Sequence, residues 1–147
     1  MILPAIIGSD GYTNLKDLYE HIVMDNPDNL PVYDITAYSA TRNTVDKGKV
    51  VVDTTNKTCY IYAEITILQN LAANDYHYMG IINNLPSSCS PKTTSSSPMS
   101  ATLTTEEGSK AFAAGYWSQY GFALFKAYGN TLATNDKYTI FGSWMYQ

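Results

Sequence analysis

The chain has 147 residues with a formal net charge of −4, long enough for one domain but too short for two full ones. Hydrophobic residues make up 45% and charged residues 15% of the sequence, which excludes global disorder. The acidic balance argues against a nucleic-acid surface, which would need clustered Lys and Arg. The longest apolar stretch, Ile2 to Ile7, is short and contains Pro4. We therefore expect neither membrane insertion nor a secretory signal.

The first predicted element is a short amphipathic helix that follows an apolar lead of residues 1–12. Its apolar residues recur at i, i+3, i+4, i+7 and i+8, as Leu15, Leu18, Tyr19, Ile22 and Val23. A helix this short is marginal alone, so it must dock on its own domain or on copies of itself. Pro27 and Pro31 end it in a linker. The sequence therefore predicts an N-terminal segment, 1–31, and a second domain, 32–147.

From residue 32 the apolar period changes to two, as is typical of β-strands. The longest candidate, residues 58–68, has one clearly apolar face. Pro- and Ser-rich residues 86–98 predict an irregular connection. Other strands are expected near residues 32–38, 49–53, 76–82, 99–105, 111–117, 122–127 and 137–146. Seven or eight short strands with turns about every ten residues indicate an all-β fold, an antiparallel β-sandwich preceded by a short helix.

One strand, Phe122 to Phe125, is apolar on both faces. Antiparallel strands with one solvated face alternate, so both faces of this strand must be covered. The sandwich core covers one face, and either a loop or another copy of the chain covers the other. We favour another copy, which makes Phe122 and Leu124 candidate oligomer-interface residues.

The usual catalytic and nucleotide-binding motifs are absent from the sequence. Neither His21 nor His77 has a partner at metal-ligand spacing, so we expect no metal and no cofactor. Cys59 and Cys89 could form one disulfide, although a small buried hydrophobe is the favoured interpretation of Cys59. We therefore expect that the protein is not an enzyme.

The second half of the chain has a recognisable order of elements. Leu85-Pro86 precedes a proline-containing loop, a hairpin is centred on Gly121, and a closing strand runs from Tyr138 to Trp144. This order resembles the C-terminal receptor-binding (head or tip) domains of tail fibre or baseplate proteins from phages of Gram-positive bacteria. The resemblance covers about residues 30–147, and this chain departs from it by a long Ser/Thr loop after Pro86.

The resemblance implies a jelly-roll-like head that adheres, as a homotrimer and without chemistry, to a host cell-surface saccharide. It places the protein in the virion, at a tail fibre or baseplate tip beside other tail or virion proteins, and outside the cell when it acts. Two alternatives stay open. One is a virion decoration or head-fibre protein without receptor binding, and the other is a free carbohydrate-binding module.

Sugar recognition combines aromatic platforms with polar groups. The candidate ligand-binding residues are accordingly Asp75, Tyr76, His77, Tyr116, Trp144 and Tyr146. A solvated turn is the alternative for residues 75–77, and Trp144 could equally lie at an interface. For the trimer, a seam of Leu15, Leu18 and Ile22 from three chains would join Phe122 and Leu124.

Overall fold

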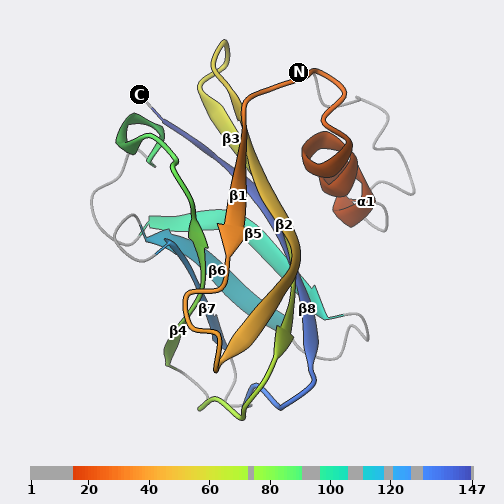
Figure 1. Cartoon of the computed structure of the whole chain (residues 1–147), viewed down its shortest axis with the longest axis vertical. Coiled ribbons are helices and arrows are strands. Elements are labelled where there is room, and N and C mark those ends of the chain that lie inside the picture. Colours follow the sequence, from red (N-terminus) through yellow and green to blue (C-terminus); the bar gives the residue numbers. More distant parts are fainter. Residues whose placement is uncertain are drawn as a thin grey trace.

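The computed structural model describes residues 15–72, 75–90, 97–105, 111–117, 121–126 and 131–146; among these, the side chains of Leu15, Tyr76 and residues 97–126 lie outside the description. The described elements are two helical segments, a 3-10 turn and eight strands (Figure 1). They are α1 (Leu15–Glu20), η1 (His21–Asp25), β1 (Val32–Thr36), β2 (Asn43–Asp53), β3 (Thr58–Ile67), β4 (Tyr76–Ile82), η2 (Ser87–Cys89), β5 (Ser97–Thr105), β6 (Ala111–Trp117), β7 (Gly121–Lys126) and β8 (Lys137–Met145).

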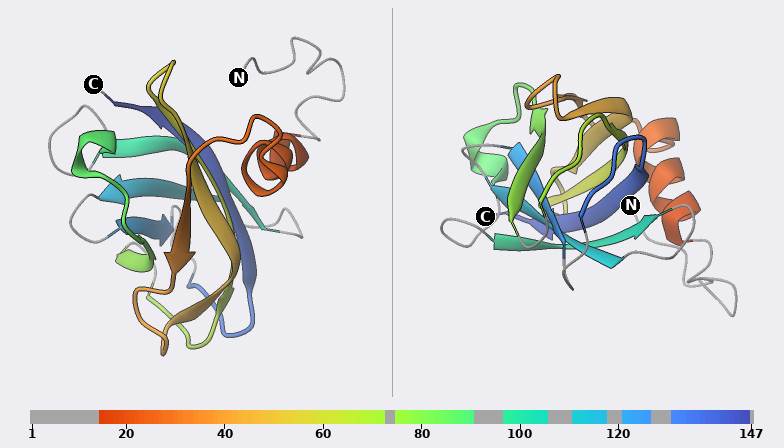
Figure 2. Two further views of the ribbon diagram at one scale, coloured as in Figure 1. Left: turned by 45° about the horizontal axis from the view of Figure 1, so that its top comes forward. Right: turned by 90° about the horizontal axis from the view of Figure 1, so that it is seen from below.

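The strands pair antiparallel throughout and follow one another in the ring β1-β2-β3-β8-β5-β6-β7-β4. The ring closes between β1 and β4, where Ile35 lies opposite Ile82 and Thr36 opposite Ile81. The all-β antiparallel prediction is confirmed. The sandwich and jelly-roll prediction is not, because the hydrogen-bonded order closes into a barrel rather than separating into two sheets (Figure 2).

The barrel interior is filled by the apolar face that the sequence predicted for β3. Ile61, Ala63 and Ile65 are fully buried there. β2 and β8 flank β3 with long registers, and their inward residues complete the same cluster. Because successive strand residues alternate between faces, the remaining residues of β3 must point outward.

The outward face of β3 is covered by the chain's own N-terminal helix. Ile22 and Val23 of η1 are buried in a second apolar cluster, in which the barrel supplies Val51, Tyr60, Tyr62 and Phe141. The aromatic ring of Tyr19 lies 5.4 Å from that of Phe141, centroid to centroid. Figure 1 shows α1 lying against the barrel beside β2 and β8. The predicted helix is thus confirmed, and it docks on its own barrel.

An ion-pair cluster joins the end of α1 to the barrel. The ammonium of Lys47 lies 2.7 Å from the carboxylate of Glu20 on α1 and 3.4 Å from that of Glu64 on β3. A register shift between Val45 and Lys47 accompanies this contact. The hydrogen bond from Lys47 lowers the pKa of Glu20. Asn26 then ends the helix in the left-handed conformation (φ 47°), immediately before Pro27.

Two of the residues predicted for a helical trimer seam pack against the barrel of their own chain. Ile22 is 2% exposed and packs in its own chain, and Leu18 packs partly buried against the same cluster. Leu15 begins α1, and its side chain is outside the described part. Neither described helix is both long and apolar enough to cross a membrane.

Candidate ligand-binding surface

Two of the predicted ligand residues lie in the barrel core. Trp144 is 6% exposed and Tyr146 is 8% exposed. The physical reason is strand register: β8 places Trp144 opposite Cys59, on the face of the sheet that points inward. The indole N–H of Trp144 donates a 2.7 Å hydrogen bond to the carbonyl of Cys89. In this position neither ring is presented to a ligand.

Both cysteines next to Trp144 are free and buried. The thiol of Cys59 lies 3.7 Å from the carbonyl oxygen of Cys89. Burial raises the pKa of the Cys59 thiol, because a thiolate is poorly solvated there. This agrees with the interpretation of Cys59 as a small buried hydrophobe.

Residues 75–77 occupy the start of β4. Asp75 is exposed just before the strand, whereas His77 is buried with Nε2 2.7 Å from the carbonyl oxygen of Ala72. A carbonyl can only accept, so Nε2 carries the proton and donates. Tyr76 pairs with Phe125 of β7. Of this group, Asp75 is therefore the one described side chain that solvent reaches.

Tyr116 and the two predicted interface residues of β7 are placed by their backbone alone. Tyr116 of β6 lies opposite Phe122, which in turn lies opposite Gly80 of β4. Leu124 pairs with His77. The side chains of Tyr116, Phe122 and Leu124 lie outside the described part of the chain. The strands β6, β7 and β4 thus form one side of the barrel, and five of the predicted residues lie on it: Tyr76, His77, Tyr116, Phe122 and Leu124.

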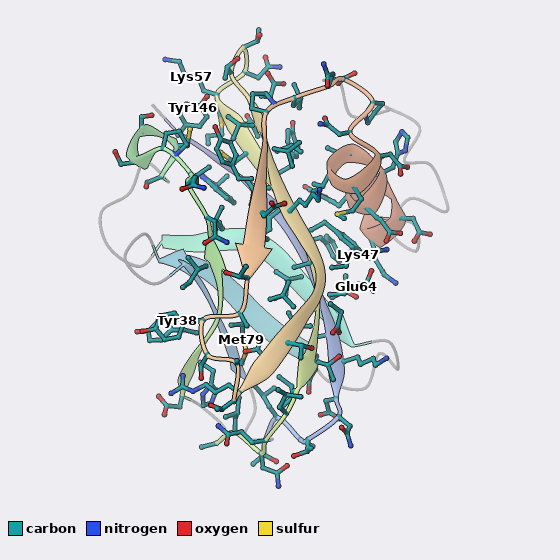
Figure 3. The ribbon with its side chains drawn as sticks, viewed as in Figure 1. Tyr38, Lys47, Lys57, Glu64, Met79 and Tyr146 are labelled. Atoms are coloured by element: carbon teal, nitrogen blue, oxygen red, sulfur yellow. The ribbon has the colours of Figure 1, made fainter. Side chains whose placement is uncertain are left out.

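An exposed aromatic pair lies at the border of this side. Tyr38, in the connection after β1, is 38% exposed, and its ring centroid is 5.4 Å from that of Tyr78 on β4 at an interplanar angle of 53°. Figure 3 shows Tyr38 on the side of the barrel away from α1. The backbone N–H of Arg42 donates to the carbonyl of Ser39, which shapes the loop directly after Tyr38.

Neutral groups flank the aromatic pair. The amide of Asn83 donates a 3.0 Å hydrogen bond to the hydroxyl of Thr36. Ile81, opposite Thr36, is also exposed. We call Thr36, Tyr38, Tyr78, Ile81 and Asn83 the Tyr38 surface.

Sequence reasoning missed this surface because Tyr38 is predicted as the end of a strand and Tyr78 as one residue of another. The signal that could have found Tyr38 is its place immediately before the polar run Ser39–Thr44, where a strand must already turn. The contact between the two rings joins residues 40 positions apart and is invisible to local pattern.

Among the described residues, no three His, Cys, Asp or Glu side chains gather where they could hold a metal ion. The Tyr38 surface itself offers aromatic faces, hydroxyls and an amide, which suit contact with a polar, uncharged molecule.

Comparisons with known proteins point in one direction. No family model and no curated protein sequence matches this chain. A solved structure does match: the head domain of the lactococcal phage bIL170, reported in a study of the receptor-binding domains of lactococcal phages. The match has a TM-score of 0.56 and covers 81% of this chain and 100% of that chain, at 15% sequence identity. At this identity the similarity shows the fold: a phage receptor-binding head fold.

Proposed function

We propose that this protein is a non-enzymatic receptor-binding module of a phage tail fibre or baseplate, which adheres to a host cell-surface saccharide. One observation carries the proposal: the fold matches the head domain of bIL170 over that domain's entire length. The resemblance in sequence to such heads rests on a different feature, the order of loops and turns in residues 30–147.

We further propose that the module acts as a homotrimer in the virion. The support is the doubly apolar strand at Phe122–Phe125, whose backbone lies between β4 and β6. A second copy against this strand would cover its outer face. Three linked sites would also raise the avidity for a repeating polymer without any new contact.

The ligand residues that we propose lie on this side of the barrel. Asp75 directly precedes β4 and Tyr76 begins it. Tyr116 lies on β6, which β7 separates from β4, and its register is that of Gly80, farther along β4. Tyr78 lies on β4, and Tyr38 packs against its ring from the connection after β1. Loops and strand ends on one side of a rigid barrel are suited to hold several contacts in a fixed geometry.

Two measurements test the proposal. The first is isothermal titration of the purified chain with a panel of purified wall polysaccharides from lactococcal and other Gram-positive strains; we expect binding to at least one polymer and no shortening of it. The second is native mass spectrometry, in which we expect three copies. A trimer that binds none of the polymers would indicate a decoration or head-fibre protein, and a monomer that binds would indicate a free carbohydrate-binding module.

A further inference from the structure

We propose that the Tyr38 surface binds a neutral pyranose unit and excludes anionic wall polymers such as polyol phosphates. The inference rests on the proposed function and specifies its ligand class and its contact residues. It is carried by the geometry of the surface and by its charge.

The aromatic geometry suits the apolar face of a sugar ring. A pyranose presents axial C–H groups on one face, and such a face packs on an aromatic ring while the hydroxyls point outward. Tyr38 is exposed to such a contact, and Tyr78 packs against its ring from within the barrel wall. Because Tyr78 already restrains the ring, ordering Tyr38 on binding costs little conformational entropy.

The polar groups beside the rings complement hydroxyls. The hydroxyl of Thr36 accepts from Asn83, which leaves its own proton for another acceptor. The side-chain carbonyl of Asn83 is an acceptor. Thr36 ends β1 and Tyr38 lies two residues later, at the bend that follows the strand, so both residues belong to the same short stretch of chain.

The charge around the surface favours a neutral ligand. The five residues of the Tyr38 surface carry no formal charge. Asp34, two residues before Thr36, lies with its carboxylate 3.8 Å from the ammonium of Lys49, so its charge is locally balanced. The whole chain carries a formal charge of −4, which repels a polyanion at long range.

The experiment compares variants on two probes, a neutral wall polysaccharide and a glycerol-phosphate polymer, by isothermal titration. We expect Tyr38→Ala to weaken binding of the neutral polymer by about tenfold or more, as the loss of an aromatic anchor does. Tyr38→Phe keeps the ring and is expected to retain binding. Met145→Ala is the control, because Met145 is 58% exposed and lies at the far end of β8. Thermal melting of each variant reports folding, and Ile81→Ala is the second probe of the surface should Tyr38→Ala not fold.

The outcomes separate this inference from the proposed function. Full binding by a folded Tyr38→Ala variant, or by Ile81→Ala in its place, overturns the assignment of the surface and leaves receptor binding standing. Preference of the unaltered chain for the glycerol-phosphate polymer overturns the ligand class. Loss of the trimer in Tyr38→Ala would show the surface to be a contact between copies, which also overturns the assignment. An unaltered chain that binds neither these nor any other wall polymer removes the proposed function itself.

Discussion

Replacing Ile22 with alanine tests whether the N-terminal helix belongs to its own barrel. Ile22 is 2% exposed and packs in the apolar cluster on the outward face of β2, β3 and β8. The substitution removes three buried carbon groups, or about 2.4 kcal/mol at about 0.8 kcal/mol per group. The cavity left behind adds to this, so the free energy of unfolding should fall by about 2–4 kcal/mol.

The same change has a local signature. Helical segments as short as α1 and η1 depend on docking rather than on intrinsic propensity. Hydrogen exchange followed by mass spectrometry should therefore show faster exchange in residues 15–25 and nearly unchanged exchange in β3 and β8. If the helix detaches as a unit, its docking free energy sets an upper limit on the loss. Val32→Ala is the matched control, because Val32 is an exposed apolar residue of β1.

Urea unfolding at several protein concentrations distinguishes the two places that Ile22 can occupy. Packing within one chain predicts a loss of stability that is independent of concentration. A trimer held through Phe122 and Leu124 would by itself raise the midpoint with concentration, so the comparison is between the variant and the unaltered chain. A seam at Ile22 predicts a loss of stability that depends on concentration and a variant that dissociates into monomers. A loss below about 0.5 kcal/mol with unchanged exchange in residues 15–25 would refute the docking of the helix through Ile22, because surface substitutions are typically that small.

Three further predictions concern charge and thiols. Burial alone would raise the pKa of Asp53, but hydrogen bonds from the β2–β3 turn outweigh it and lower the pKa to about 2. Asp53 therefore stabilises the fold fully above pH 3.8, its ordinary pKa, and this stabilisation is lost as the pH falls toward about 2. Asp53→Ala should lower the free energy of unfolding in urea by about 1–3 kcal/mol at pH 7, and the variant should lose less stability than the unaltered chain on acidification. Lys47→Met should cost at most about 1 kcal/mol, because its pair with Glu20 is partly exposed, and the cost should shrink in 1 M salt and as pH falls through the lowered pKa of Glu20. A salt-independent loss would contradict this. Cys59 and Cys89 should both escape a thiol reagent in the native chain and react in denaturant; rapid native labelling of Cys59 would contradict its burial.

Local pattern predicted most of the elements of this fold. The spacing of Leu15 through Val23 predicted the helix, because apolar residues that recur about every 3.6 positions all lie on one face of an α-helix. The two-residue alternation of residues 58–68 predicted β3 and its buried face, and the structure confirms both. The predicted strand at 49–53 was too short because the first half of β2 carries polar residues, which do not show the apolar pattern of a strand. Pairing with β3 holds these residues in the strand.

The candidate site was harder to read from local pattern. Trp144 and Tyr146 are aromatic residues near the end of the chain and so look available to a ligand. Pairing of β8 with β3 instead turns Trp144 into the core, and Tyr146, directly after β8, is buried in the same cluster. Neither Tyr38 nor Tyr78 stands out singly, and only the barrel brings their rings together. Burial of a strand residue depends on which neighbour lies across the sheet, and the residue's own neighbours in sequence do not specify that partner.

Sequence by itself determined the secondary structure, the inward face of the longest strand and the absence of familiar catalytic motifs, because each of these depends on residue type and spacing over a few positions. Only the tertiary structure decided that the strands close into a barrel, that the N-terminal helix covers the outward face of β3, and that Tyr38 meets Tyr78. These three features are contacts between segments far apart in the chain. They depend on which apolar surfaces of the whole molecule pack against one another and so become buried.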